Sequence, residues 1–355
     1  MKSSWIKPAF AWGVTGAAFF YLYQSVDWSE LLHALRNARA EYVSIAIALT
    51  VSSYLLRSRR WQLLFLNTKL RYIDAMRVLF LGFFMNNILP ARAGELVRAH
   101  MGSKVAQTKR TVVLATVASE RLADGLTLSV IFALFSWQLT HSEFHTELTY
   151  VALFFGLAAL GTGAVLLFRQ SVFGIAEAAL NRVRPGTTKH NAARYTLDRF
   201  KLFVNELRPL YTKSSFPIIA LWSAVVWGVE LCVYVAVAHA FDIQFSIAEC
   251  VLFMTTVNFS SLIPAAPGAI GVIEAITKVV LVSIGIDPET ALAMVITQHA
   301  IQYLVVGVPG GLSMLTWKQE ISQIDKDREE QDNGSPDAAS PAVSSDVSAL
   351  EQSQV

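Results

Sequence analysis

Long apolar stretches separated by short polar segments dominate the hydrophobic pattern of this 355-residue chain. A transmembrane helix needs about 17 to 25 mostly apolar residues. Stretches of this kind lie at residues 8–23, 42–56, 111–137, 149–168, 216–240 and 289–316. The pattern therefore predicts an all-α polytopic membrane protein with six full transmembrane helices.

Two further apolar stretches, 73–89 and 249–263, are each followed by a proline-containing break and a second short apolar piece. Lys and Arg, which gather in cytoplasmic loops, indicate how these stretches sit. Five such residues lie in 57–72, five in 91–110 and nine in 169–214, whereas 138–148, 241–248 and 285–289 contain none. This alternation holds only if neither stretch crosses the membrane. We predict two re-entrant hairpins, the first entering from the cytoplasm and the second from outside, with both chain termini cytoplasmic.

The two breaks resemble each other in sequence. Leu89–Gly94 aligns with Ile263–Gly268. The same offset aligns the asparagines before the first break with the serines before the second. Broken helices in corresponding positions of an inverted repeat are typical of a transporter's substrate site. We therefore predict an inverted repeat built around the two hairpins.

Composition excludes a soluble enzyme, because only 16% of the residues are charged and 54% are hydrophobic, whereas soluble domains carry about a quarter charged residues. Residues 319–355 hold nine acids and two cations, so the net charge of +2 leaves +9 for residues 1–318. We predict an integral membrane domain over 1–318 and a disordered acidic cytoplasmic tail over 319–355. The basic loop 169–214 is expected to form amphipathic helix on the anionic inner leaflet. Nucleic acid is not an expected partner.

Candidate ligand residues lie beside the breaks. Backbone that leaves helical geometry inside a bilayer must line a cavity or be buried in protein, and the helices that restart after a break offer positive N-terminal ends that favour phosphate. The candidates are Asn87, Arg92, Gly94, Glu95, Arg98, Ser261, Gly268 and Glu274. Plainer alternatives stay open: capping by the polar side chains, helix packing at the glycines, snorkelling of the arginines, and pairing of Glu274 with Lys278.

Three charged residues, Glu120, Arg121 and Asp124, lie inside the apolar stretch 111–137, with the two acids on one helical face. Charges in a membrane span normally face a partner or a polar path. One interpretation is substrate or proton binding, and the alternative is an internal ion pair that fixes helix packing. The sequence contains no nucleophile–base triad, P-loop or dinucleotide fingerprint, so we expect no catalytic residues, metal site or cofactor.

These residues together carry a family resemblance. The set comprises Asn87, Leu89, Pro90, Arg92, Gly94, Glu95, Arg98, Glu120, Arg121, Asp124, Pro264, Pro267, Gly268, Gly271 and Glu274. Over roughly residues 5–318 the chain resembles the membrane domain of the lysylphosphatidylglycerol synthase/flippase family, also called multiple peptide resistance factors, and its stand-alone flippase-like relatives. One departure is Ala269, which stands where the family run usually has a second glycine. The resemblance implies lipid translocation without lipid synthesis, because no synthase domain follows.

We therefore expect a flippase that moves a phosphate-bearing lipid, an anionic or modified phospholipid or a lipid-linked substrate, between the leaflets of the cell inner membrane. Two alternatives stay open. One is an integral membrane enzyme acting on a lipid-linked phosphate or sugar, with Glu120 and Asp124 as its candidate carboxylates. The other is a non-transporting partner of an envelope-synthesis enzyme. Membrane lipids are the expected ligands, and a homo-oligomer is left open.

Overall fold

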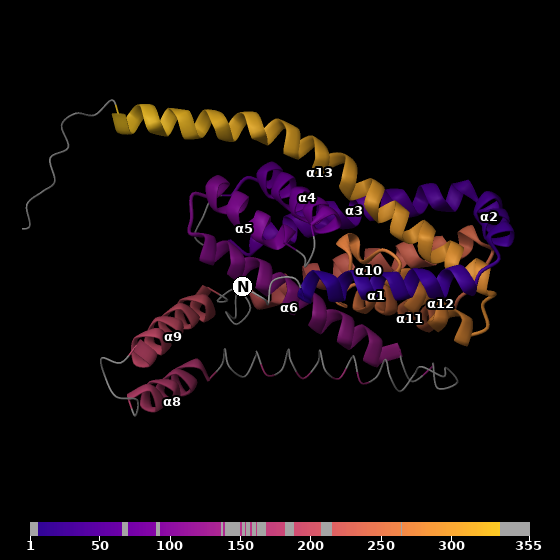
Figure 1. Ribbon diagram of the computed structural model, residues 1–355, viewed down its shortest axis with the longest axis horizontal. Coiled ribbons are helices and arrows are strands. Elements are labelled where there is room, and N and C mark those ends of the chain that lie inside the picture. The colour runs from indigo at the N-terminus through magenta and orange to yellow at the C-terminus, as the bar shows by residue number, and fades with distance from the viewer. Residues whose placement is uncertain are drawn as a thin grey trace, which may run out of the picture. The chain divides into compact units, whose positions relative to one another are not determined.

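The computed structural model describes residues 6–65, 70–89, 93–135, 168–181, 188–206, 215–263 and 265–333, together with the single positions 138, 150, 153, 157 and 161. Every regular element within these residues is a helix (Figure 1). This confirms the predicted all-α class. The chain divides into two compact units, residues 1–313 and 314–355, and all that follows on the site concerns the first.

Long helices occupy most of the predicted spans. They are α1 (Ile6–Gln24), α3 (Ala40–Leu63), α6 (Arg110–Phe135), α10 (Phe216–Ala240) and α13 (Pro288–Asn333). Among the described residues, Phe216–Ala240 and Pro288–Trp317 are long and apolar enough to cross a membrane by length and composition. The predicted span 149–168 falls almost wholly outside the described residues. The number of six crossings stays a prediction.

Both predicted breaks are present as interruptions between two packed helices. The first lies between α4 (Tyr72–Ile88) and α5 (Gly94–Val105). The second lies between α11 (Ile247–Ser260) and α12 (Val272–Ser283), and it contains the short 3-10 helix η4 (Pro267–Ala269). Pro90, Arg92 and Pro264 lie outside the described residues. The entry of these pairs from opposite membrane faces stays a prediction.

Local side-chain chemistry explains where the shorter elements begin. The Asp27 carboxylate accepts hydrogen bonds from the backbone N–H groups of Ser29 (2.8 Å) and Glu30 (3.3 Å), which caps α2 (Trp28–Asn37). Ser246 and Glu249 form a reciprocal capping box at the start of α11. Capping satisfies backbone donors that have no partner inside the helix.

The basic segment 169–214 contains two helices, α8 (Arg169–Asn181) and α9 (Thr188–Glu206), which pack against each other. Phe173 and Phe200 meet edge to face across this contact, and Lys201 forms an ion pair with Glu177. The Lys201 hydrogen bond lowers the pKa of the Glu177 carboxyl. Their predicted position on the inner leaflet is not tested by these contacts.

Two predicted boundaries fall inside helices. The basic segment 57–72 was assigned to a loop, but α3 continues to Leu63, and Arg57 and Arg60 are buried within it. This corrects the loop assignment: hydropathy counts a cation as polar, whereas here buried carboxylates surround it. At the other end, α13 continues past residue 318 to Asn333. The predicted disorder of residues 319–355 stays a prediction for residues 334–355, which lie outside the described residues.

The interior of the first unit is unusually rich in charge. Arg60 and Glu120 are fully buried, and Arg98 is 1% exposed. Large apolar side chains lie on the outside instead. Examples are Trp12, Phe20, Leu221, Leu304 and Leu312. A charged interior within an apolar exterior suits a protein that is surrounded by lipid.

Candidate functional site

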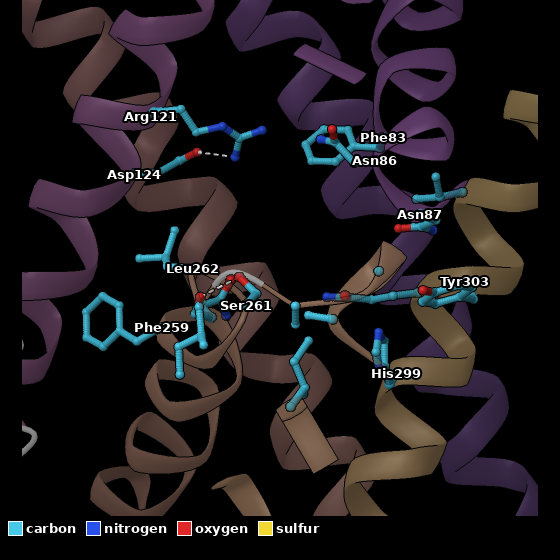
Figure 2. Close-up of a pocket in the computed structure, with 18 of the residues that line it drawn as sticks. Phe83, Asn86, Asn87, Arg121, Asp124, Phe259, Ser261, Leu262, His299 and Tyr303 are labelled. Atoms are coloured by element: carbon cyan, nitrogen blue, oxygen red, sulfur yellow. Dashed lines mark hydrogen bonds and ion pairs between the residues drawn. The ribbon is translucent and has the colours of Figure 1, made fainter. Parts of the chain in front are cut away.

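A cavity of about 610 Å³ lies in the first unit, and both breaks contribute to its wall. Its polar lining residues are Tyr54, Arg57, Asn86, Asn87, Glu95, Arg121, Asp124, Trp227, Glu230, Asn258, Ser261, His299, Gln302 and Tyr303. Figure 2 shows Arg121 and Asp124 on one side and Asn87, His299 and Tyr303 on the other. Helices far apart in sequence therefore converge on one polar space.

Asp124 is held by groups from two other helices. Its Oδ1 atom lies 2.7 Å from Arg60 Nη1 of α3 and accepts a hydrogen bond from Trp227 Nε1 of α10 at 3.0 Å. Its Oδ2 atom lies 3.9 Å from Arg57 and makes no hydrogen bond among the described residues. One carboxylate oxygen is thus held by two hydrogen-bonding partners, and the other is buried without a hydrogen bond from the described residues.

Glu230 is the second buried acid of the cavity. Its Oε2 atom accepts hydrogen bonds from Ser53 Oγ (2.6 Å) and Arg57 Nη2 (3.2 Å), and its Oε1 atom accepts one from Gln302 Nε2 (3.4 Å). Arg57 also stacks over the Trp227 ring, with 4.8 Å to the centroid. These contacts join α3, α10 and α13 by charge-assisted hydrogen bonds, which are stronger than neutral ones.

Arg121 makes the third charged contact of the cavity. Its Nε atom donates a hydrogen bond to Glu95 Oε1 at 3.0 Å, linking α6 to the first turn of α5. Its Nη atoms lie 3.9 Å from Asp124 Oδ2 and 4.0 Å from Glu120 Oε1, too far for hydrogen bonds. The sequence suggested that Arg121 pairs with Asp124 or Glu120 on its own helix, whereas its hydrogen-bonded partner is Glu95 of α5.

Arg98 and Glu120 form a separate buried pair. The Arg98 fork reaches both oxygens of Glu120, at 3.2 and 2.6 Å, and its guanidinium lies 4.5 Å from the Trp61 ring centroid. Gly82 makes room for this arginine, because a Cβ there would overlap the Arg98 side chain. Neither member of the pair lines the cavity. Their positions favour the packing interpretation over ligand contact.

The two predicted glycines differ in role. A Cβ on Gly94 would overlap the carbonyl oxygen of Gly82, so Gly94 lets α4 and α5 approach closely. Gly268 lies on the cavity wall with φ +69°, and a Cβ there would overlap the Tyr303 hydroxyl. Ala269 follows with φ +55°, a left-handed conformation that costs a non-glycine residue about 1–2 kcal/mol.

Glu274 acts at the second break as a cap. Its Oε2 atom accepts a hydrogen bond from the Gly271 N–H at 2.6 Å, and its Oε1 atom lies 2.5 Å from His299 Nδ1. Lys278 instead donates to the Ser25 carbonyl and hydroxyl at 2.7 and 2.9 Å. Among the described residues Glu274 therefore pairs with His299 of α13, and not with Lys278, the partner that the sequence left open.

The structure brings together about half of the residues proposed from the sequence. Those that line the cavity are Asn87, Glu95, Arg121, Asp124, Ser261 and Gly268. Those that do not are Gly94, Arg98, Glu120 and Glu274. Arg92 lies outside the described residues. The ligand roles of the cavity-lining residues stay predictions.

Sequence reasoning missed Arg57 and Glu230. Arg57 was counted with a loop, because it lies at the polar end of an apolar stretch. Glu230 did carry a signal, since it is the single acid in the apolar stretch 216–240. The rule that charges in spans face partners would have selected it. Among the described residues no cluster of His, Cys, Asp and Glu could hold a metal ion.

Residues 5–310 match the family model described as the lysylphosphatidylglycerol synthase TM region. The glycosyltransferase AglD of Haloferax volcanii is 25% identical over 340 residues, covering 85% of this chain and 53% of that relative. UPF0104 membrane proteins of Methanocaldococcus jannaschii and Pyrococcus horikoshii are each 21% identical, covering 84% and 79% of this chain and 91% and 88% of their own lengths. The chain thus spans about half of the first relative and nearly all of the other two.

Proposed function

This chain belongs to the family of the lysylphosphatidylglycerol synthase TM region, and on that premise we propose that it is a lipid transporter. It moves a phosphate-bearing lipid headgroup between membrane leaflets through the polar cavity. The lipid tails stay in the bilayer, while the headgroup exchanges its water shell for the polar groups of the cavity wall.

The observation that carries this proposal is the placement of charge. Arg57, Asp124 and Glu230 lie inside, around the cavity, whereas large apolar side chains are exposed on α1, on α10 and on α13 between Leu304 and Leu312. Buried charge is costly in a membrane protein and is typical of a substrate pathway. A volume of about 610 Å³ is within the range of small-molecule pockets, which suits a headgroup rather than a whole lipid.

The two interrupted helix pairs support a pathway as well. We propose that α4–α5 and α11–α12 are re-entrant hairpins in six full crossings, with both termini in the cytoplasm of a cell inner membrane. Irregular backbone within a bilayer is tolerated where it borders a cavity, and both breaks border this one. Opposed hairpins would let the cavity open to either leaflet in turn.

An enzymatic alternative rests on one observation, the similarity to the glycosyltransferase AglD, of which the chain covers about half. Of the two carboxylates that the sequence suggested for catalysis, Glu120 is bound at both oxygens by Arg98, and Asp124 has one oxygen fixed by Arg60 and Trp227. Carboxylates held by arginines in this way stabilise the packing of the helices and are less suited to transfer protons in catalysis. Recruitment of an envelope-synthesis enzyme is a third alternative.

Purified protein in liposomes tests these alternatives. Fluorescently labelled phosphatidylglycerol and phosphatidylcholine are placed in one leaflet, and their appearance in the other is followed by dye quenching. We expect movement without chemical change. A chemically modified lipid would support the enzyme, and neither movement nor modification would refute both.

Matched leucine substitutions locate the pathway. Ser261→Leu places an apolar side chain on the cavity wall and should slow movement of both lipids. Ser52→Leu makes the same change on an exposed position of α3 and should leave the rate unchanged. Equal rates in the two variants would contradict transport through this cavity.

A further inference from the structure

The ion pair Glu95–Arg121 differs from every other ion pair that the described residues place around the cavity. Its side chains are 30% and 32% exposed, whereas those of Glu230 and Arg57 are 3% and 8% exposed. Exposed pairs are weak, because water competes with them. Glu95–Arg121 is therefore the pair that can open at least cost.

The Arg121 guanidinium has unused hydrogen-bonding capacity. Among the described residues its single hydrogen bond is the one from Nε to Glu95, although an arginine carries five N–H donors. Arg57, by comparison, donates to both Ser53 and Glu230. Figure 2 shows the Arg121 side chain extending toward the Phe83 ring, which lies 5.3 Å from it. An aromatic face beneath a guanidinium fixes its plane and leaves its edge accessible.

We propose that Arg121 is the ligand of the headgroup phosphate and that Glu95 is its resident counter-ion, which the phosphate displaces. This inference rests on the proposed transport function. The planar arginine fork binds two phosphate oxygens at once. The carboxylate of Glu95 accepts the hydrogen bond from Arg121 Nε and so takes one of these positions.

The location of Glu95 makes this exchange reversible. It lies in the first turn of α5, where unpaired N–H groups and the positive end of the helix stabilise a carboxylate. After displacement Glu95 is therefore still compensated. Its return expels the phosphate, so binding stays weak enough for release. A transporter needs both steps, since a headgroup held too tightly does not leave.

The inference makes an unusual prediction, that removal of a polar contact improves binding. Glu95→Gln keeps the size of the side chain but removes the competing charge. Affinity for dihexanoyl phosphatidylglycerol in detergent should rise about fivefold, which corresponds to about 1 kcal/mol at 1.4 kcal/mol per factor of ten. Glu95→Ala should act in the same direction. Arg121→Gln should abolish binding, and the double variant Glu95→Gln/Arg121→Gln should bind no better than Arg121→Gln.

A matched control is Glu249→Gln, which removes a first-turn glutamate from α11 at a half-buried position that does not line the cavity. Its affinity should equal that of the wild type. Binding is measured by isothermal titration on the purified full chain. Dihexanoylglycerol, which lacks phosphate, should not bind to any variant. Inorganic phosphate should bind more weakly than the lipid.

Several results would overturn the inference. Unchanged or weaker lipid binding by both Glu95 variants would show that the pair is structural. Binding of inorganic phosphate without binding of the lipid would also overturn it. Failure of transport itself is distinguishable, because the wild type would then neither bind phosphatidylglycerol nor move it in liposomes. If the wild type transports lipid but the Glu95 variants bind it no more tightly, the counter-ion role of Glu95 would be refuted and the transport function would stand.

Discussion

The two breaks of this molecule look alike in sequence and are built differently. At the first, α4 ends at Ile88 and α5 restarts at Gly94, whose lack of a side chain lets two helices touch. At the second, residues 261–271 connect α11 to α12 through three left-handed positions, Gly268, Ala269 and Gly271. Among the described residues, close helix packing marks the first break, and left-handed backbone conformation marks the second.

The two breaks also differ in which of them contributes a charged residue to the cavity. The first arm contributes Glu95 to the cavity and Arg98 to the buried pair with Glu120. At the second arm, Glu274 is used to cap Gly271 and to bind His299. At the first break a glutamate thus lines the cavity, whereas at the second a glutamate holds the backbone of its own loop.

The largest expected effect concerns the close packing of the first break. Gly94→Ala would place a Cβ on the Gly82 carbonyl oxygen, which is backbone and cannot rotate away. We expect a loss of about 3 kcal/mol in stability, at the upper end of overpacking costs. Gly228→Ala on α10 is the control, because no atom lies within 4 Å of the added Cβ. Thermal unfolding in detergent compares them, and equal midpoints would contradict the packing role.

A smaller effect is expected at the second break, where the obstacle is a side chain. Gly268→Ala meets the Tyr303 hydroxyl and also takes an alanine into a left-handed conformation. The strain alone should cost about 1–2 kcal/mol, with the steric overlap added. Tyr303→Phe removes a hydroxyl that has no hydrogen-bond partner among the residues that the structure describes. The double variant should therefore recover part of the unfolding midpoint. No recovery would show that the overlap is not with Tyr303.

The smallest effect should be a gain. Ala269 has φ +55°, so Ala269→Gly relieves left-handed strain. The greater freedom of glycine in the unfolded chain opposes this gain and costs about 0.5–1 kcal/mol of folding free energy. The net stabilisation should be at most about 1.5 kcal/mol. Ala275→Gly, in the interior of α12, is the control and should destabilise. A lower midpoint for Ala269→Gly would mean that the strain at the second break is compensated by contacts of the methyl group.

Much of the fold follows from local properties of the sequence. The lengths of apolar stretches predicted α1, α3, α6, α10 and α13, because helix length in a membrane protein is set by bilayer thickness. Prolines and glycines predicted both breaks, because they interrupt helical hydrogen bonding. Glu95, Arg121 and Asp124 were selected from the sequence since their charges stand close to a break or within an apolar stretch, and all three line the cavity.

Partnership was decided by the tertiary structure alone. Arg57 and Glu230 are 173 residues apart in sequence and 3.2 Å apart in space. Arg98 was expected near a ligand and instead binds Glu120, whereas Arg121 turned from its helix neighbours to Glu95. A charged residue in an apolar stretch predicts that a partner lies nearby in the fold, because leaving a buried charge unpaired is costly. Which partner it takes depends on how whole helices pack, and no local pattern encodes that.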